Sequence, residues 1–330
     1  MSTSHRWIRV SLVGLLASAL CTVAAGRASA EPTGFVPVAV ARLLDTRPGF
    51  ATVDGTSAGI GRLPAGSITE VQATGRAGIS EGTSSVALTV TVTGASRPGF
   101  VTVYPCGPVP GVSTVNFAAG QTIAGSAVSA LDANGRFCVF AMTDVDVIVD
   151  VTGSFTSAIT ALPPGRLFDS RRGYATTDGQ QQAGGALAAG SVTVVHVGGR
   201  LGVPLGAEAA ALTITVTEPT SAGFVSAYPC GPRPLVSTVN HVAGQTISNA
   251  GIVPLDANGD VCMFTVSPTH LVVDVTAAVP AGSPYTPVAP ARLADTRFDG
   301  VSIDGTCSAT GRPRNRRTLP PFPTGRSSDL

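Results

Sequence analysis

The sequence predicts an all-β protein built from tandem antiparallel β-sandwich modules with one disulfide in each. Three observations predict this fold class. Apolar residues alternate with threonine and other polar residues at a period of two, as in half-buried strands. A segment of domain length occurs twice. Each copy contains its own pair of cysteines, while 39 glycines and 25 prolines punctuate the chain.

The alternation is clearest in two segments of the first copy. "ALTVTVT" (87–93) places Leu88, Val90 and Val92 on one face and threonine on the other. "VDVIVDV" (145–151) places four valines on one face. Valine and threonine are stiff at χ1 and fit a pleated surface. We expect eight strands per module, which in the first copy lie near 36–44, 67–74, 86–93, 100–104, 113–117, 121–131, 136–142 and 145–152.

The repeat has an offset of 124 residues, since residues 35–155 align with 159–279 and 159 − 35 = 124. "GFVTVYPCGPVPGVSTVNFAAGQTI" (99–123) becomes "GFVSAYPCGPRPLVSTVNHVAGQTI" (223–247). A third copy opens at "YTPVAPARLADTRFDGVSIDGT" (285–306). We therefore expect β-module 1 at 31–156, β-module 2 at 157–282 and the truncated start of a third module at 283–306.

Both ends of the chain differ from the repeats. His5, Arg6 and Arg9 precede an apolar run, and Ala28-Ser29-Ala30 follows it, which predicts a signal peptide at 1–30 that is cleaved after Ala30. The mature chain should then reach the cell exterior or cell surface. Leu20 before Cys21 disfavours a lipoprotein signal. Residues 307–330 carry no strand pattern, and we expect a disordered tail or a sequencing artefact there.

Composition excludes several classes of function. A net charge of +1 gives no basis for binding nucleic acid. No segment after the signal peptide reaches the ~18 apolar residues of a membrane span. All 21 basic residues are arginines, which excludes Schiff-base and P-loop chemistry, since both need a lysine. No cofactor is expected.

The cysteines predict one disulfide within each module. Cys106 and Cys138 recur as Cys230 and Cys262. In an exported protein such pairs form disulfides, and each would stabilise its module by roughly 3–4 kcal/mol. The alternative, a metal site, lacks histidine or cysteine neighbours at ligand spacing, so no metal is expected.

These motifs together resemble a known repeat. The order RLLDTR, YPCG, STVNFAAGQTI, DANG and VDVTGSF is similar to a repeat module of secreted actinobacterial proteins, over residues 35–306. Such proteins carry the module alone, in tandem, or joined to secreted hydrolases. The resemblance implies an extracellular surface or accessory module and implies no activity of the module itself.

The phrase "RLLDTR" (42–47) and its second copy "RLFDSR" (166–171) place opposite charges in an apolar strand. Burying either charge alone is costly, so we expect structural ion pairs with an aspartate of the last strand. The residues are Arg42, Asp45, Arg47 and Asp150 in module 1, and Arg166, Asp169, Arg171 and Asp274 in module 2. A carboxylate pair that binds a cation or a sugar remains the alternative.

Other motifs are weaker. "GTSAG" (55–59) matches a hydrolase elbow but lies in a glycine-rich loop, and the second copy reads "GQQQA". "DANGD" (256–260) resembles a calcium loop but fits a tight hairpin turn better, as does "DANG" at 132–135. Tyr104 and Tyr228 recur in register and are candidates for ligand binding.

Three functions remain open at this point. The sequence favours a secreted, non-catalytic surface or adhesion array. The alternative is a carbohydrate- or cell-wall-binding accessory region of a larger, truncated secreted hydrolase. An enzyme in its own right is the least favoured, and any catalytic domain would lie beyond residue 306. The expected partners are cell-wall polysaccharide or a surface protein.

Overall fold

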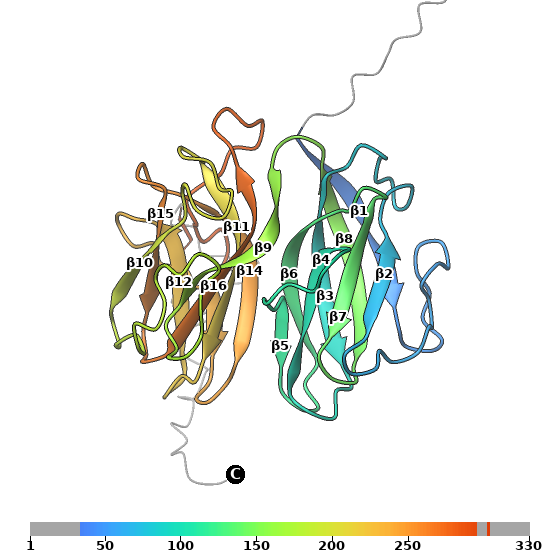
Figure 1. Ribbon diagram of the computed structural model, residues 1–330, viewed down its shortest axis with the longest axis horizontal. Helices are drawn as coiled ribbons and strands as arrows, with labels where there is room; N and C mark the ends of the chain where they lie inside the picture. Colours follow the sequence, from blue (N-terminus) through green and yellow to red (C-terminus); the bar gives the residue numbers. More distant parts are fainter. Residues whose placement is uncertain (1–33, 296–301, 304–330) are drawn as a thin grey trace, which may run out of the picture. The chain divides into compact units, whose positions relative to one another are not determined.

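The computed structural model describes residues 34–295 and 302–303. The described chain is all-β: it has 16 strands, no helix, and four antiparallel sheets of four strands each (Figure 1). No helix of this part of the chain is therefore long and apolar enough to cross a bilayer. The predicted fold class is confirmed. The predicted signal peptide and the tail at 307–330 lie outside the described residues.

Module 1 is a sandwich of two sheets, with the strand orders β1-β8-β3-β6 and β2-β7-β4-β5. We call the first the long-strand sheet and the second the short-strand sheet. The strands are β1 (Phe35–Asp45), β2 (Ile68–Gln72), β3 (Ser85–Thr93), β4 (Gly99–Pro105), β5 (Val115–Phe117), β6 (Ile123–Ala130), β7 (Arg136–Ala141) and β8 (Asp146–Phe155).

Module 2 repeats this topology, with the long-strand sheet β14-β11-β16-β9 and the short-strand sheet β10-β15-β12-β13. The strands are β9 (Thr160–Asp169), β10 (Val192–His196), β11 (Ala209–Thr217), β12 (Gly223–Pro229), β13 (Val239–His241), β14 (Ile247–Pro254), β15 (Asp260–Thr265) and β16 (His270–Val279). Pro163 and Pro164 lie in β9, an edge strand where a missing N–H donor is tolerated.

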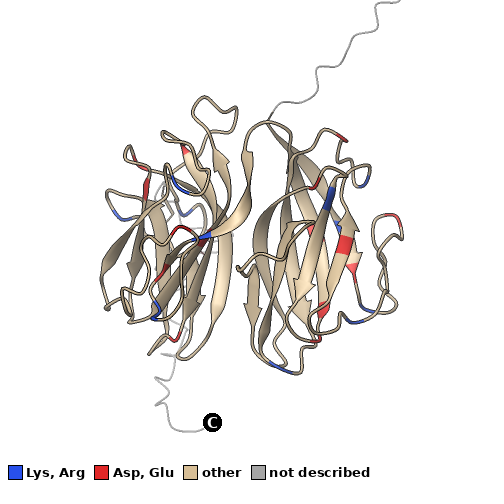
Figure 2. Ribbon diagram, viewed as in Figure 1, with Lys and Arg blue, Asp and Glu red and all other residues tan. Residues whose placement is uncertain are grey.

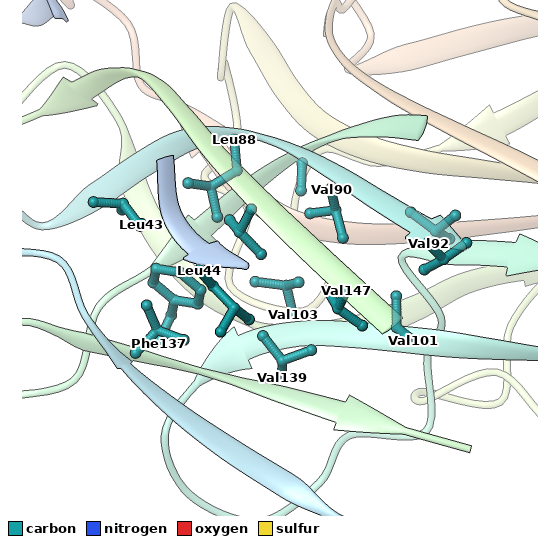
Figure 3. Close-up of a cluster of buried hydrophobic side chains, with 14 of the residues drawn as sticks. Leu43, Leu44, Leu88, Val90, Val92, Val101, Val103, Phe137, Val139 and Val147 are labelled. Atoms are coloured by element: carbon teal, nitrogen blue, oxygen red, sulfur yellow. The ribbon is translucent and has the colours of Figure 1, made fainter. Parts of the chain in front are cut away.

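Each module has its own hydrophobic core between its two sheets. In module 1, Val90 of the long-strand sheet and Val103 and Val139 of the short-strand sheet point into this core (Figure 3). The alternate residues of the same strands point outward, as the period of two requires. The outward faces are therefore available to form binding surfaces or module contacts.

The turns at "DANG" differ from the expectation in one respect. Gly135 N donates to Asp132 O at 3.0 Å, and Gly135 has a φ of 72°, so a tight turn does form. It joins β6 to β7, however, and these strands belong to different sheets. The turn is a crossover between the sheets of the sandwich, so the predicted hairpin is wrong, and the same holds between β14 and β15.

The third copy forms no strand in its described residues, but it keeps a local contact of the other two. Arg292 Nη1 lies 3.1 Å from Asp295 Oδ2, as Arg42 pairs with Asp45. Ile303 N donates to Arg292 O, as Val53 N donates to Arg42 O. The arginine–aspartate phrase therefore has a local conformation that does not depend on a complete sheet.

Candidate functional site

Four charged side chains of module 1 meet where β1 pairs with β8. Arg42 Nε donates to Asp150 Oδ1, and Arg42 Nη1 donates to Asp45 Oδ2, both at 2.9 Å. Arg47 donates to the two oxygens of Asp45 at 3.0 and 2.8 Å. Because the side chain of Asp45 is fully buried, loss of these donors would leave an unpaired charge in the protein interior.

Module 2 has the same network. Arg166 Nε donates to Asp274 Oδ1 at 2.9 Å, and Arg166 Nη1 donates to Asp169 Oδ2 at 3.2 Å. Arg171 donates to both oxygens of Asp169. The structure thus brings the eight residues together as two ion-pair networks that tie the first strand of each module to its last. Charged residues are otherwise sparse over both modules (Figure 2).

The two networks differ in how burial changes the pKa of their aspartates. Burial opposes ionisation of Asp45, but the N–H donors of Arg47 outweigh it and lower the pKa of that carboxyl. Burial dominates at Asp274 and raises the pKa of that carboxyl to about 6, even though Arg166 pairs with it. The side chain of Asp274 is 1% exposed, whereas that of its counterpart Asp150 is 22% exposed.

A second pair of ion pairs was not singled out from the sequence. Arg76 donates to both oxygens of Asp54, and Arg200 donates to both oxygens of Asp178. The hydrogen bonds from Arg76 lower the pKa of Asp54 to about 2. Both arginines are buried and anchor the long loop after the first strand of their module. The offset of 124 residues, applied to charged residues in loops, would have found them.

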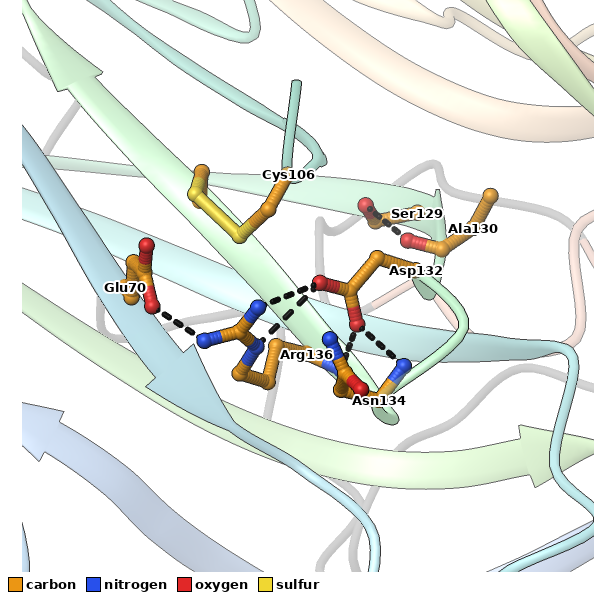
Figure 4. Close-up of a disulfide and its surroundings, with 8 residues drawn as sticks. Glu70, Cys106, Ser129, Ala130, Asp132, Asn134 and Arg136 are labelled. Carbon is orange, nitrogen blue, oxygen red and sulfur yellow. Dashed lines mark hydrogen bonds and ion pairs between the residues drawn. A yellow bond between two sulfur atoms is a disulfide. The ribbon is translucent and has the colours of Figure 1, made fainter.

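The two predicted disulfides are present, Cys106–Cys138 and Cys230–Cys262, each with a Cα–Cα distance of 4.9 Å. The first joins the loop after β4 to the neighbouring strand β7, and the second joins the loop after β12 to the neighbouring strand β15. Figure 4 shows the first disulfide beside Arg136, which pairs with Glu70 on β2 and with Asp132 in the turn.

The tyrosines beside the disulfides need a correction. Tyr104 pairs in register with Cys138, and the loop that the disulfide holds lies next to it. Tyr104 is 1% exposed and Tyr228 is 3% exposed. Neither ring is free to stack on a ligand, so these two residues are not the ligand-binding candidates that the sequence indicated.

Serine and histidine meet twice in the described residues. Ser170 Oγ lies 2.9 Å from His270 Nδ1, and Ser267 Oγ lies 3.4 Å from His241 Nε2. Both serines are buried, and Ser170 Oγ also accepts a hydrogen bond from the backbone N–H of Leu271. These hydroxyls are parts of the packed interior and do not face a substrate.

An exposed feature does recur in both modules on the outward face of the short-strand sheet. Ile68 pairs in register with Phe140, and the ring of Phe140 lies 6.1 Å from that of Phe100. We call this set the apolar stripe. In module 2 the apolar stripe consists of Val192, Phe264 and Phe224, with the two rings again 6.1 Å apart.

The apolar stripe is accessible to solvent. Ile68 is 49% exposed and Val192 is 50% exposed, while the four phenylalanines are half-buried. Polar pairs lie further along the same face: Arg136 with Glu70 in module 1, and His196 with Asp260 in module 2. An apolar surface with a few polar groups at its side is typical of ligand-binding sites.

The modules contact each other along β6 and β14. Phe155, Ile159 and small side chains such as Ala209 and Ala211 pack in a third hydrophobic cluster there. Asn116 Nδ2 donates to Ser248 Oγ at 3.2 Å, and Ser248 Oγ donates to Thr114 O at 2.8 Å.

This contact covers equivalent residues of the two modules unequally. Thr213, Thr215 and Thr217 on the long-strand sheet of module 2 are buried. Their module 1 counterparts, Thr89, Thr91 and Thr93, are partly exposed. Conversely, Asn116 is buried, whereas its counterpart Asn240 is exposed. Around Ala87 and Val128, module 1 also presents the outward face of its long-strand sheet to module 2. The contact is unequal at one end, where the edge around β5 of module 1 lies over Thr215 and Thr217 of module 2.

Comparison with known proteins gives little to add to this geometry. No protein-family model matches the chain, and no curated protein matches it. The chain is similar to the solved N-terminal CBM22-1–CBM22-2 tandem domain of Xyn10C from Paenibacillus barcinonensis, with 13% sequence identity and a TM-score of 0.21. The match covers 76% of this chain and 99% of that chain.

Proposed function

We propose that the chain is a non-catalytic tandem binding protein of the cell exterior, and that each module holds a stretch of polysaccharide on its apolar stripe. The observation that carries the proposal is the recurrence of this exposed stripe at equivalent positions of both modules. The fold needs no aromatic pair on this outward face, because each core is filled by the inward residues.

The chemistry of the stripe suits a sugar chain. A pyranose ring has an apolar C–H face and a rim of hydroxyls, so it packs on an aromatic surface and hydrogen-bonds at its edge. In module 1 the phenylalanines offer the apolar surface. In module 2 the guanidinium of Arg233 lies over the ring of Phe264, with its central carbon 3.9 Å from the ring centroid, so a ligand there meets Phe224, Val192 and this stacked arginine. The Arg136–Glu70 and His196–Asp260 pairs offer hydrogen-bonding groups nearby. The two disulfides fit an oxidising compartment, which supports a location outside the cytoplasm.

Two equivalent stripes on one chain favour a polymer over a small ligand. Once one module has bound, the second binds at a high effective concentration, and avidity can exceed the affinity of one module by ~10²–10⁴-fold. A repetitive ligand such as a polysaccharide can use both stripes. A surface protein with a repetitive apolar epitope is the other partner that the test must separate.

The test is retention of the full chain on insoluble peptidoglycan, chitin, cellulose and xylan. We expect retention on at least one of them, and at least a tenfold loss for the double variant Phe140→Ser/Phe264→Ser. Each single variant should lose less, because one stripe remains. Leu205→Ser is the matched control, since Leu205 is 85% exposed and lies in a loop outside the stripe. If the chain binds none of the four, or if the double variant is retained like the original protein, the proposal is wrong.

A further inference from the structure

A cavity of about 230 Å³ lies at the contact between the two modules. Module 1 lines it with Phe100, Val112 and Asn116, and module 2 lines it with Arg171, Tyr174 and Thr215. We call it the junction pocket. It adjoins the apolar stripe of module 1 through Phe100.

One polar atom of the junction pocket has no partner. The hydroxyl of Thr215 is buried, and within the described residues it makes no hydrogen bond. Buried hydroxyls in native structures almost always have a partner, in the protein or in a bound molecule. Thr217, two residues along the same strand, does have one, since its hydroxyl lies 2.7 Å from that of Thr246. Thr215 thus lines the cavity and carries a buried hydroxyl that has no partner in the described residues.

The other walls offer both N–H donors and an aromatic ring. Arg171 uses Nε and Nη2 on Asp169, which leaves Nη1 without a hydrogen bond to the described residues. The guanidinium of Arg171 stacks on the ring of Tyr174, with its central carbon 3.7 Å from the ring centroid. Asn116 adds an amide and Phe100 a second ring. Donors and apolar faces therefore line the same small space.

The volume limits what this space can hold. At ~30 Å³ per water molecule, 230 Å³ corresponds to about eight waters. Pockets for drug-sized ligands are usually larger, ~300–1,000 Å³. A single six-membered sugar ring fits the size, and its hydroxyls and C–H face match the two kinds of wall.

We propose that the junction pocket binds one sugar ring, with a ring hydroxyl on Thr215 and another on the free N–H donors of Arg171. The inference builds on the proposed polysaccharide function and places a second kind of subsite beside the stripe. The pocket needs both modules. Module 1 has the same residue types on its own sheet, Thr91 and Arg47 with Phe50 in place of Tyr174, but these residues line no cavity with a preceding module in the described chain.

The repeat provides matched controls for the test. Titration of the full chain with glucose, xylose, galactose, N-acetylglucosamine and glucuronic acid, followed by threonine-methyl NMR, should show saturable shifts at Thr215 for at least one sugar. Thr215→Val keeps the shape of the side chain and removes the hydroxyl. It should weaken binding and so raise the dissociation constant for the sugar at least tenfold. Tyr174→Ala should do the same. Thr91→Val and Phe50→Ala, the equivalent changes in module 1, should leave the constant unchanged.

Two outcomes overturn the inference: no sugar shifts Thr215, which means that water alone fills the pocket, or Thr91→Val weakens binding as much as Thr215→Val. Neither outcome touches the proposed function, which is tested separately by retention on insoluble polysaccharide. The variant Phe140→Ser/Phe264→Ser should lose retention and keep the dissociation constant for the single sugar. A chain that binds the single sugar but no polymer would uphold the pocket and contradict the proposed function.

Discussion

At the residue scale, Asp45 and Asp274 are two buried carboxylates whose pKa values move in opposite directions. Asp45 accepts the side-chain and backbone N–H groups of Arg47 as well as a hydrogen bond from Arg42. Within the described residues, Asp274 accepts side-chain hydrogen bonds from Arg166 alone. Hydrogen bonds therefore outweigh desolvation at Asp45, and desolvation outweighs the ion pair at Asp274.

Asp274 should give the protein a pH dependence opposite to that of most carboxylates. The pKa of its carboxyl is about 6 in the folded protein, above the ordinary value of 3.8 that it has in the unfolded chain. The folded state therefore binds the proton more tightly than the unfolded state does. Its contribution to the free energy of unfolding should rise as the pH falls from about 6 to about 4, by up to roughly 3 kcal/mol. Above pH 6 this contribution is lost, because both states are ionised and the folded state holds a buried charge.

The measurement is a carboxyl-carbon NMR titration of the full chain, with Asp274→Asn used to assign the signal. A midpoint near 6 is expected. A midpoint below 4 would show that the Arg166 pair dominates after all. Urea unfolding at pH 5 and pH 7 should give the matching difference in stability, and that difference should shrink in Asp274→Asn.

The sequence predicted the members of the arginine–aspartate networks but misjudged the tyrosines. Alternation places Arg42 and Asp150 on one face of neighbouring strands, so pairing follows from register alone. Tyr104 also points outward from its strand. Its burial comes from the loop that Cys106 pins over the sheet, and a period-two pattern carries no information on loops that fold back over an outer face.

At the element scale, the strands were predictable and their partners were not. β3 and β8 lie where the alternation places them, because their valines fill one core. The turn at Asn134-Gly135 reads as a hairpin, yet it links β6 and β7 in different sheets. A glycine at positive φ fixes a reversal of the chain, while the choice of sheet depends on which face must cover the core.

The disulfide prediction belongs to this scale. Cys106→Ser/Cys138→Ser should lower the free energy of unfolding of module 1 by ~3–4 kcal/mol, because the unfolded chain regains the freedom of a 32-residue loop. The loop should also loosen over Tyr104. Acrylamide quenching of tyrosine fluorescence should therefore increase.

Cys230→Ser/Cys262→Ser is the matched variant, since it opens a loop of the same length in module 2. The two losses should be equal within about 1 kcal/mol. A loss below 1 kcal/mol in either module would show that the short-strand sheet holds the loop without the disulfide.

At the scale of the whole molecule, the junction between the modules is the feature that alignment of the repeats could not show. The repeated sequences are nearly equivalent, but their contact is not. A small difference between the repeats decides this contact, since Ser248 of module 2 stands where module 1 has Ala124. Only the serine hydroxyl can form a hydrogen bond with Asn116.

This contact can be tested with one pair of variants. Asn116→Ala should lower the free energy of unfolding by ~1–2 kcal/mol, because it removes the buried hydrogen bond from Asn116 Nδ2 to Ser248 Oγ. Asn240→Ala changes the equivalent residue, which is exposed, and should stay within ~0.5 kcal/mol of the original protein. Equal effects in urea unfolding would contradict an asymmetric junction.

The asymmetry has a consequence for chain length. A contact between identical faces is exhausted once two units have met, whereas a contact between an edge and a sheet face leaves one of each unused. In the described chain, module 1 keeps its sheet face partly open and module 2 keeps the edge around Asn240 open. The part of the junction between Asn116 and Thr215 therefore has an unused counterpart on each module, around Asn240 and around Thr91, and a further repeat that used it would create one more junction pocket. The number of repeats would then set the valency of the protein directly, without any new surface having to evolve.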